Sequence, residues 1–243
     1  MSARAGEVDD VVRTVLRIWA DDAAAHARAL VRSDPTWGSE VVPLAGGWLV
    51  LSGNGMYVNR ALGLGVDEDL GIDDIEVLVA RSRALGLSPA VEVTPATTRR
   101  SVERLADRGF VHDVDDDVIA LFRPIPGAPV QAPDDVEVRS VRSAADLALW
   151  QSTSALGWGH IDAEARRVSD AFTVAAHAVD GEGMVIAFDR ASGEPIGCAS
   201  VTINRGVATL GGMSTVPEHR GRGVQAALIR HRVDVAVATA CDL

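Results

Sequence analysis

A proline-rich segment in the middle of the chain constrains the fold more than any other feature. Four prolines fall within the ten residues 124–133, which read Pro-Ile-Pro-Gly-Ala-Pro-Val-Gln-Ala-Pro. Proline fixes φ and has no N–H to donate, so such a segment cannot form a helix or a central strand. The sequence therefore predicts two domains, 1–123 and 134–243, joined by a linker at 124–133. In a chain of 243 residues, each half is long enough to bury a hydrophobic core.

Composition argues against several classes of partner and chemistry. The formal net charge of −11 disfavours a general affinity for nucleic acid or for an anionic membrane. The N-terminus lacks an apolar signal core and no apolar stretch is long enough to span a bilayer, so we expect a cytoplasmic protein. Cys198 and Cys241 fit neither a disulfide framework nor a zinc pattern, so no metal is predicted. The chain contains no lysine, which excludes a Schiff-base lysine.

In the first half, hydrophobic periodicity predicts three helices and several short strands. Apolar residues recur at helical spacing through 9–32. Two apolar runs flank Ala45-Gly46-Gly47, which is the pattern of a β-hairpin. The predicted helices are 9–32, 73–85 and 97–109, and the predicted strands are 41–44, 48–51, about 56–64, 90–93 and 118–122.

The second half predicts a strand, two helices, three strands, a turn and a last helix. Ser143 stands where a helix N-cap is expected, and the loop 157–160 (Gly-Trp-Gly-His) is expected to end that helix. The predicted strands are 136–141, 184–188, 195–204 and 207–216, and the predicted helices run from Ser143, over 162–172 and over 224–240.

The turn between the last strand and the last helix carries the clearest chemical signal. It contains Arg220-Gly221-Arg222-Gly223. The first N–H groups of a helix have no partner within the helix, and the helix dipole places partial positive charge there. Glycine permits positive φ and lets an anion approach the backbone, while arginine adds forked donors for phosphate oxygens. Together these features predict a pyrophosphate-binding site.

These residues resemble the pyrophosphate-binding turn of the GNAT superfamily of N-acyltransferases, whose pattern is Gln/Arg-x-x-Gly-x-Gly/Ala. Arg220, Gly223 and Gln225 fall on its three fixed positions; the first two match, and Gln225 replaces the usual small residue. The resemblance implies an α/β (α+β) fold, with a mixed, mostly antiparallel sheet flanked by helices, and acetyl-CoA as co-substrate. It also implies that the strand before the turn offers backbone groups to the pantetheine arm. The implied cofactor-binding residues are Met213, Ser214, Thr215, Arg220, Gly221, Arg222, Gly223, Val224, Gln225 and Ala226.

The first half is also similar to part of a GNAT fold. Val91-Glu92-Val93-Thr94-Pro95, followed by a helix and Arg108-Gly109-Phe110, is reminiscent of the closing segment of the family. The segment 63–67 holds no basic turn, so this half is not expected to bind CoA. A tandem GNAT protein with a degenerate N-terminal half is the nearest resemblance, and an unrelated α/β domain is the alternative.

A GNAT domain continues past its third helix with a fifth strand and a fourth helix, whereas this sequence ends at Cys241-Asp242-Leu243. We therefore expect an incomplete second domain with weakened activity, because the tyrosine that often protonates the leaving thiolate has no counterpart. Alternatively, a strand from the N-terminal half or from a second subunit, in a homodimer, fills the gap.

No catalytic residue is identified by the sequence. Glu218 is a weak candidate for a general base, and its alternative role is to favour the helix N-terminus that follows. His160 is a weak candidate for a substrate contact, and its alternative is a plain loop residue. The resemblance implies acetyl transfer to a primary amine, on a small molecule or a peptide. The rival hypotheses are a non-catalytic pair that binds CoA or a protein partner, and a nucleotide or phosphate binder.

Overall fold

The computed structural model describes residues 5–117, 121–122, 124–125, 127–160, 162–179 and 182–243. The chain divides into two compact units, Met1–Leu121 and Phe122–Leu243, which we call unit 1 and unit 2. Each unit is described by itself. No helix in the described ranges combines the length and the apolar character needed to cross a membrane.

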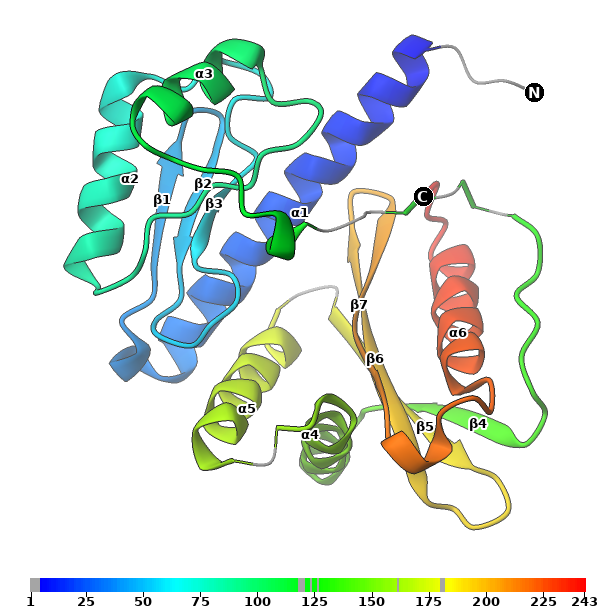
Figure 1. Cartoon of the computed structure of the whole chain (residues 1–243). Helices are drawn as coiled ribbons and strands as arrows, with labels where there is room; N and C mark the ends of the chain where they lie inside the picture. Colours follow the sequence, from blue (N-terminus) through cyan, green and yellow to red (C-terminus); the bar gives the residue numbers. More distant parts are fainter. Residues whose placement is uncertain (1–4, 118–120, 123, 126, 161, 180–181) are drawn as a thin grey trace. The chain divides into compact units, whose positions relative to one another are not determined.

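Unit 1 places a three-stranded antiparallel sheet between two helices (Figure 1). The strand order is β1-β2-β3, and the helices on its two sides are α1 and α2. One core cluster joins Leu49 and Leu51 of the sheet to Ile75 and Leu78 of α2. The elements are α1 (Ala5–Ser33), η1 (Pro35–Trp37), β1 (Glu40–Leu44), β2 (Gly47–Leu51), β3 (Arg60–Leu62), α2 (Ile72–Ala84), α3 (Arg99–Asp107) and η2 (Val114–Asp116).

The three helices and the hairpin predicted for the first half are confirmed, but two predicted strands are shorter than expected. The strand expected around 56–64 is reduced to Arg60–Leu62, because Asn59 bonds the backbone of Ser52, Gly53 and Met56 and holds the preceding residues in a loop. The strand expected at 90–93 is a single parallel bridge between Val91 and Ala61. The strand expected at 118–122 falls largely on 118–120, outside the described residues, and 121–122 have no regular structure.

Unit 2 is built on a fully antiparallel four-stranded sheet with the order β4-β5-β6-β7. Its order of strand, two helices, three strands, turn and helix confirms the sequence prediction. The α/β fold with a mostly antiparallel sheet flanked by helices is likewise confirmed. The elements are β4 (Val136–Ser140), α4 (Ala144–Trp158), α5 (Ala163–His177), β5 (Glu182–Asp189), β6 (Pro195–Asn204), β7 (Val207–Thr215), η3 (Pro217–His219) and α6 (Val224–Ala238).

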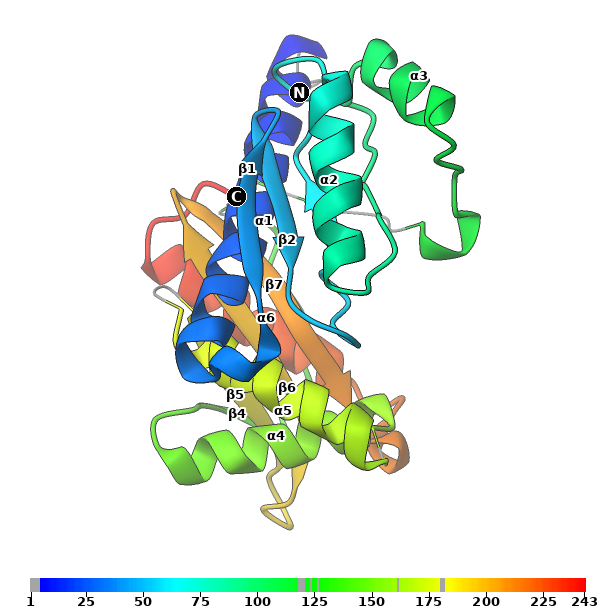
Figure 2. The same ribbon diagram turned by 90° about the vertical axis from the view of Figure 1, so that its left-hand side faces the viewer.

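Alternating side chains of β5 face two separate cores, one on each side of the sheet of unit 2. Val185 and Ala187 pack with Leu228 of α6, whereas Met184 and Ile186 pack with Trp150 of α4. The period of two along a strand explains this separation. Figures 1 and 2 show α6 covering one face of the sheet, with α4 and α5 on the other.

The end of α4 differs from the prediction. The loop 157–160 was expected to end the helix before Gly157. Instead, α4 continues through Gly157 to Trp158, and the residue that caps it is Gly159, whose φ is 74°. A left-handed residue after the last turn is the usual glycine role at a helix end. A glycine is needed at 157, within the helix, because a side chain there would overlap Ser214 of β7. This contact cannot be predicted from the local sequence. The helix predicted at 162–172 continues to His177, and the last helix ends at Ala238.

Candidate functional site

The turn before α6 has the backbone conformation expected of an anion-binding site. Gly221 and Gly223 both have φ of +76°, a region that favours glycine. Gly223 is the N-cap of α6, and no side chain caps this helix. The N–H groups of Val224, Gln225 and Ala226 therefore open the helix without a partner inside it. The turn thus combines an uncapped helix N-terminus with two glycines at positive φ.

Arg220 ties three elements together at this turn. Its Nη2 donates to the carbonyl oxygen of Gly157 at 3.0 Å, and its Nε donates to the carbonyl oxygen of Thr215 at 3.4 Å. These two contacts join the end of α4, the end of β7 and the turn. The side chain predicted as a phosphate ligand is thus also part of the scaffold that holds the turn.

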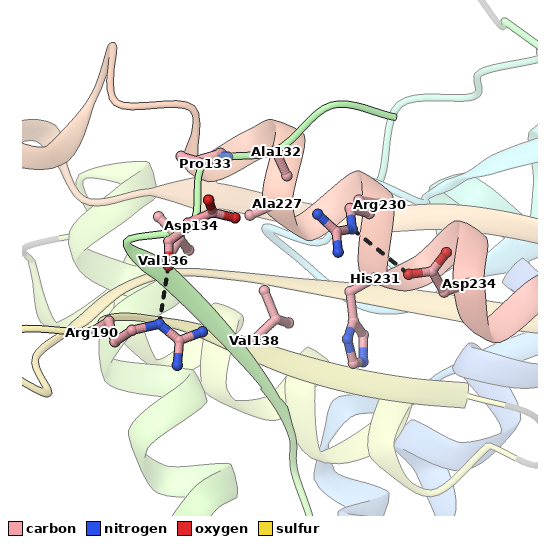
Figure 3. Close-up of a pocket in the computed structure, with 10 residues that line it drawn as sticks. All are labelled: Ala132, Pro133, Asp134, Val136, Val138, Arg190, Ala227, Arg230, His231 and Asp234. Carbon is pink, nitrogen blue, oxygen red and sulfur yellow. Dashed lines mark hydrogen bonds and ion pairs between the residues drawn. The ribbon is translucent and has the colours of Figure 1, made fainter. Parts of the chain in front are cut away.

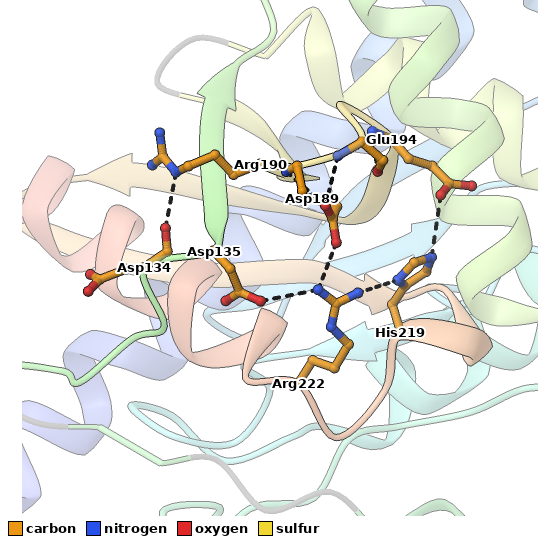
Figure 4. Close-up of polar contacts among 9 residues, drawn as sticks. Asp134, Asp135, Asp189, Arg190, Glu194, His219 and Arg222 are labelled. Atoms are coloured by element: carbon orange, nitrogen blue, oxygen red, sulfur yellow. Dashed lines mark hydrogen bonds and ion pairs between the residues drawn. The ribbon is translucent and has the colours of Figure 1, made fainter.

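The Arg222 guanidinium is engaged by carboxylates from two other parts of unit 2 (Figure 4). Nη2 lies 2.7 Å from Asp189 Oδ2 and 3.1 Å from Asp135 Oδ2, and Nη1 lies 3.0 Å from His219 Nδ1. Backbone N–H groups of the following turn, chiefly that of Ser192, and Arg222 lower the pKa of Asp189 to about 2. Arg222 therefore anchors the turn to the start of β4 and the end of β5.

A β-bulge in β7 decides which backbone groups face away from β6. Ser200 pairs with Gly211 and Cys198 with Ser214, so β7 contains one extra residue, and Gly212 has φ of +54°. Upstream, the Ala208 N–H points away from β6 and donates to the carbonyl oxygen of Leu243 at 2.8 Å. Downstream, the Val216 N–H points toward β6 and donates to the carbonyl oxygen of Ile196 at 3.0 Å. In an antiparallel pair, successive residues alternate between bonding the neighbouring strand and facing away from it. The N–H and C=O groups of residues 213 and 215 therefore point outward, away from β6.

Among the residues predicted on β7, Thr215 offers a polar atom that the described protein does not satisfy. Its side chain is buried, and its Oγ1 has no hydrogen-bond partner among the described residues. Thr215 pairs with Gly197, where a side chain would overlap Val224 of α6, and paired residues point to the same face. The hydroxyl therefore lies on the α6 face of the sheet, below the turn.

These observations fit a bound diphosphate. An ideal Cβ built on Gly221 meets no heavy atom within 4 Å, so space is open beside the backbone of the turn. The uncapped N-terminus of α6 supplies donors that have no partner inside the helix. Such a set of groups suits an anion with several oxygen acceptors.

The two candidates for catalysis differ in their surroundings. Glu218 is exposed in the first turn of η3. His160 is half-buried, its backbone N–H donates to the carbonyl oxygen of Ala155, and its Nδ1 is buried without a partner among the described residues. Neither contacts the other, so the structure assembles no acid–base pair from them. No group of three or more metal-ligating side chains was found in the described ranges.

A pocket of about 190 Å³ lies elsewhere in unit 2, between α6, β4 and the segment before it (Figure 3). Valine, alanine and proline side chains line it together with charged ones. Arg230 lies 4.0 Å from Asp234, and Arg190 donates to the carbonyl oxygen of Asp134. None of the predicted cofactor residues lines this pocket, which lies near the β4 edge of the sheet rather than the β7 edge.

Sequence reasoning missed the residues that hold the turn from outside it. Gly157, Asp135 and Asp189 lie between 33 and 87 residues from their arginine partners. Among these three residues, Gly157 has a local signal, but a glycine near the end of a helical pattern predicts a helix break rather than a close contact. The two aspartates have no local pattern that distinguishes them from other acidic loop residues.

Comparisons with known proteins agree with this architecture. Residues 147–243 match the model of the family described as Acetyltransferase (GNAT) family. A search of curated proteins found no match. The solved structure of a GCN5-related N-acetyltransferase from Kribbella flavida is 16% identical, with a TM-score of 0.56, and the match covers 92% of this chain and 82% of that one.

Two further solved structures are similar to parts of the chain. A GCN5-related N-acetyltransferase from Sphaerobacter thermophilus has a TM-score of 0.45 at 14% identity, over 64% of this chain and 49% of that one. The protein AAC(6')-Iy, in complex with the bisubstrate analogue CoA-S-monomethyl-acetylneamine, has a TM-score of 0.34 at 22% identity, over 44% of this chain and 74% of that one.

The Kribbella flavida structure shares the fold of this chain, and the family match spans α4 to the last residue. The matched region includes the bulged strand, the glycine turn and α6. Residues 147–243, which hold the candidate site, therefore match the GNAT acetyltransferase family, and the chain shares its fold with a GCN5-related N-acetyltransferase.

Proposed function

We propose that the chain transfers an acetyl group from acetyl-CoA to a primary amine, and that unit 2 binds the co-substrate. The observation that carries the proposal is the uncapped N-terminus of α6 behind Gly221 and Gly223, both at φ of +76°. It follows an edge strand whose residues 213 and 215 direct backbone groups outward. Helix N-termini of this kind bind phosphate groups, and an outward-facing strand edge binds extended amide-containing chains.

The roles of the turn residues follow from their contacts. The backbone N–H groups from Gly221 to Ala226 would hold the pyrophosphate, and Arg220 would add a charged donor while remaining bonded to Gly157 and Thr215. Arg222, bound to Asp189 and Asp135, would orient the turn rather than contact phosphate directly. Met213, Ser214 and Thr215 would align the pantetheine arm along β7.

The proposed reaction is direct attack of a neutral amine on the thioester carbonyl. The C–N bond forms, the C–S bond breaks, the amine loses a proton, and the CoA thiolate gains one. The outward N–H of residue 213 is suited to polarise the acyl oxygen, since oriented backbone donors stabilise developing negative charge. Glu218 and His160 remain the candidates for proton transfer.

Titration calorimetry of the full chain with acetyl-CoA tests the co-substrate. We expect micromolar binding by the wild type, roughly the range typical of enzyme substrates. Gly221→Ala should weaken binding roughly tenfold, because its Cβ enters the open space beside the turn. Gly193→Ala is the matched control, since Gly193 has φ of +73° and an ideal Cβ there also meets no atom within 4 Å. Equal affinities of both variants and the wild type would refute the site.

A thiol-release assay over a panel of primary amines then separates catalysis from binding alone. Release of CoA that depends on the amine supports the transferase. Tight binding of acetyl-CoA, without release for small amines and for peptides, supports the non-catalytic alternative. If the folded protein binds no CoA derivative, the transferase and the CoA-binding form of the alternative are both excluded, and binding of a protein partner is left.

A further inference from the structure

At the β7 bulge, three backbone carbonyls accept hydrogen bonds from side chains. They belong to Ala199 and Ser200 of β6 and to Gly211 of β7, where the register shifts by one residue. A buried carbonyl without a donor destabilises a fold, so side-chain donors stabilise a sheet where its register is irregular. Side chains from the two covering helices reach these three groups.

Arg232 of α6 approaches the bulge from one face of the sheet. Its Nη1 donates to the carbonyl oxygens of Ser200 at 2.9 Å and Gly211 at 3.2 Å, so one nitrogen spans both strands where the register shifts. Its Nη2 lies 3.0 Å from Met213 Sδ, and its Nε donates to the carbonyl oxygen of Leu228. The side chain is 1% exposed, which makes it one of the largest fully buried side chains described.

Trp150 of α4 approaches from the opposite face. Its Nε1 donates to the carbonyl oxygen of Ala199 at 3.1 Å, and its ring is buried. An ideal Cβ on Gly212 would lie 3.5 Å from the same ring. The bulge is thus bonded by a guanidinium on one side and packed by an indole on the other.

The burial of Arg232 is costly for the protein. All its hydrogen-bond acceptors in the structure are neutral, and desolvation lowers its pKa to about 10. Cys198, the neighbouring group that favours the charged guanidinium, has its own pKa raised by burial to about 11, so it is a neutral thiol at neutral pH. A buried cation without a charged partner is destabilising, and an apolar side chain at this position of a helix would avoid that loss. An apolar side chain, however, could not donate hydrogen bonds to both strands, as the guanidinium does.

We infer that Arg232 is a positioning residue for the acyl-CoA site: it holds the β7 bulge, and the bulge turns the backbone of residues 213 and 215 outward. The first half of this inference concerns the strand alone. The second half, that outward groups bind the pantetheine arm, rests on the proposed function.

Amide hydrogen exchange on the full chain tests the first half without any ligand. Arg232→Met keeps an unbranched apolar side chain but removes the donors. We expect exchange in residues 211–216 to rise roughly tenfold, as loss of buried hydrogen bonds allows, with a smaller change in β4 and β5. Arg232→Lys keeps a charge but has a shorter reach and lacks the Nε and Nη2 donors, so it should give an intermediate result; it also serves if the Met variant fails to fold.

Val185→Ala is the control, because Val185 lies in the same α6-facing core but on β5, outside the two strands that form the bulge. It should raise exchange across the sheet without a maximum at 211–216. If Arg232→Met and Arg232→Lys show the same uniform pattern as Val185→Ala, Arg232 is an ordinary core residue and the inference is wrong.

Acetyl-CoA titration of the same three variants tests the second half. The Arg232 variants should lose roughly tenfold or more in affinity, while Val185→Ala stays within roughly twofold of the wild type. If the exchange pattern appears but the wild type binds no acetyl-CoA, the proposed function fails while the role of Arg232 in the bulge stands. If the wild type binds and the Arg232 variants bind equally well, the positioning role is overturned although the proposed function survives.

Discussion

The Nη2 of Arg220 lies 3.0 Å from the carbonyl oxygen of Gly157, which joins the glycine turn to the last turn of a helix 63 residues earlier in the chain. The same guanidinium bonds the last residue of β7 through the Thr215 carbonyl. An arginine that the motif assigns to phosphate binding is therefore held in place by α4 and β7. A charged donor that is already oriented loses less conformational entropy when a ligand binds.

Arg220→Ala should weaken acetyl-CoA binding more than Arg220→Lys does. Alanine removes both the phosphate donor and the two carbonyl contacts, whereas lysine retains a positive charge without the fork. We expect a loss of roughly tenfold to a hundredfold for alanine and a smaller loss for lysine, measured by calorimetry. Arg230→Ala, an exposed arginine on α6 that is not part of the turn, is the control. Equal losses for Arg220→Ala and Arg230→Ala would mean that net charge alone governs affinity.

Gly157→Ala should destabilise unit 2, although alanine usually favours a helix. A side chain at 157 would overlap Ser214 and lie 3.2 Å from the Thr215 nitrogen, so α4 and β7 would have to separate. We expect a loss of about 1–3 kcal/mol in the free energy of unfolding, typical of overpacking. Urea denaturation gives this value, and Ser152→Ala on the same helix is a matched substitution away from β7. A gain in stability at 157 would show that the close approach is not needed.

Acid should remove the stabilisation contributed by Asp189. Its pKa falls from 3.8 to about 2 in the folded protein, through backbone N–H groups led by that of Ser192 and through Arg222. A depressed folded pKa means that the contribution is complete above pH 3.8 and is lost as the pH falls toward about 2. Asp189→Asn should therefore be less stable than the wild type at pH 6, and the difference in urea midpoint should shrink at pH values near 3 and below.

Asp234→Asn is the comparison for this pH series, because Asp234 is exposed and lies 4.0 Å from Arg230. Its difference from the wild type should be small at every pH. A difference for Asp189→Asn that stays constant down to pH 2 would show that Asp189 acts through packing or neutral hydrogen bonds alone.

Cys198 should resist thiol reagents in the folded protein. Its side chain is fully buried, and burial raises its pKa to about 11, so the reactive thiolate is scarce at neutral pH. Cys241 is buried as well. We expect neither thiol to react with a disulfide reagent until denaturant is added. Rapid reaction of Cys198 at neutral pH in the native protein would show that α4 separates readily from the sheet.

Local patterns predicted most of the elements, and contacts distant in sequence decided the rest. Helical spacing through 9–32 and the N-cap Ser143 needed no tertiary information, so both predictions agree with the structure. The strand at 56–64 failed because the Asn59 side chain competes for the backbone of a loop. The break at Gly157 failed because the reason for that glycine lies on β7, in Ser214.

The candidate site divides in the same way. Arg220, Gly221 and Gly223 are predicted from their order along the chain, because glycine and arginine before a helix form a local pattern. The partners of Arg222, Asp135 and Asp189, were not found, because an ion pair across 87 or 33 residues leaves no pattern in the sequence. The amine acceptor, the proton-transfer residues and the kinship of unit 1 to the GNAT fold stay predictions.

The extra residue at Gly212 divides β7 into two halves that differ in which residues direct their backbone N–H and C=O groups away from β6. Before Gly212, the backbone groups of even-numbered residues such as Ala208 point away from β6. After it, those of odd-numbered residues such as Thr215 point away from β6. Deleting that one residue would leave every side chain chemically intact and yet turn the downstream half by one step, so that groups now facing outward would face β6. In a scan of substitutions along β7, the alternation between residues that face β6 and residues that face away from it therefore has to be counted separately before and after Gly212.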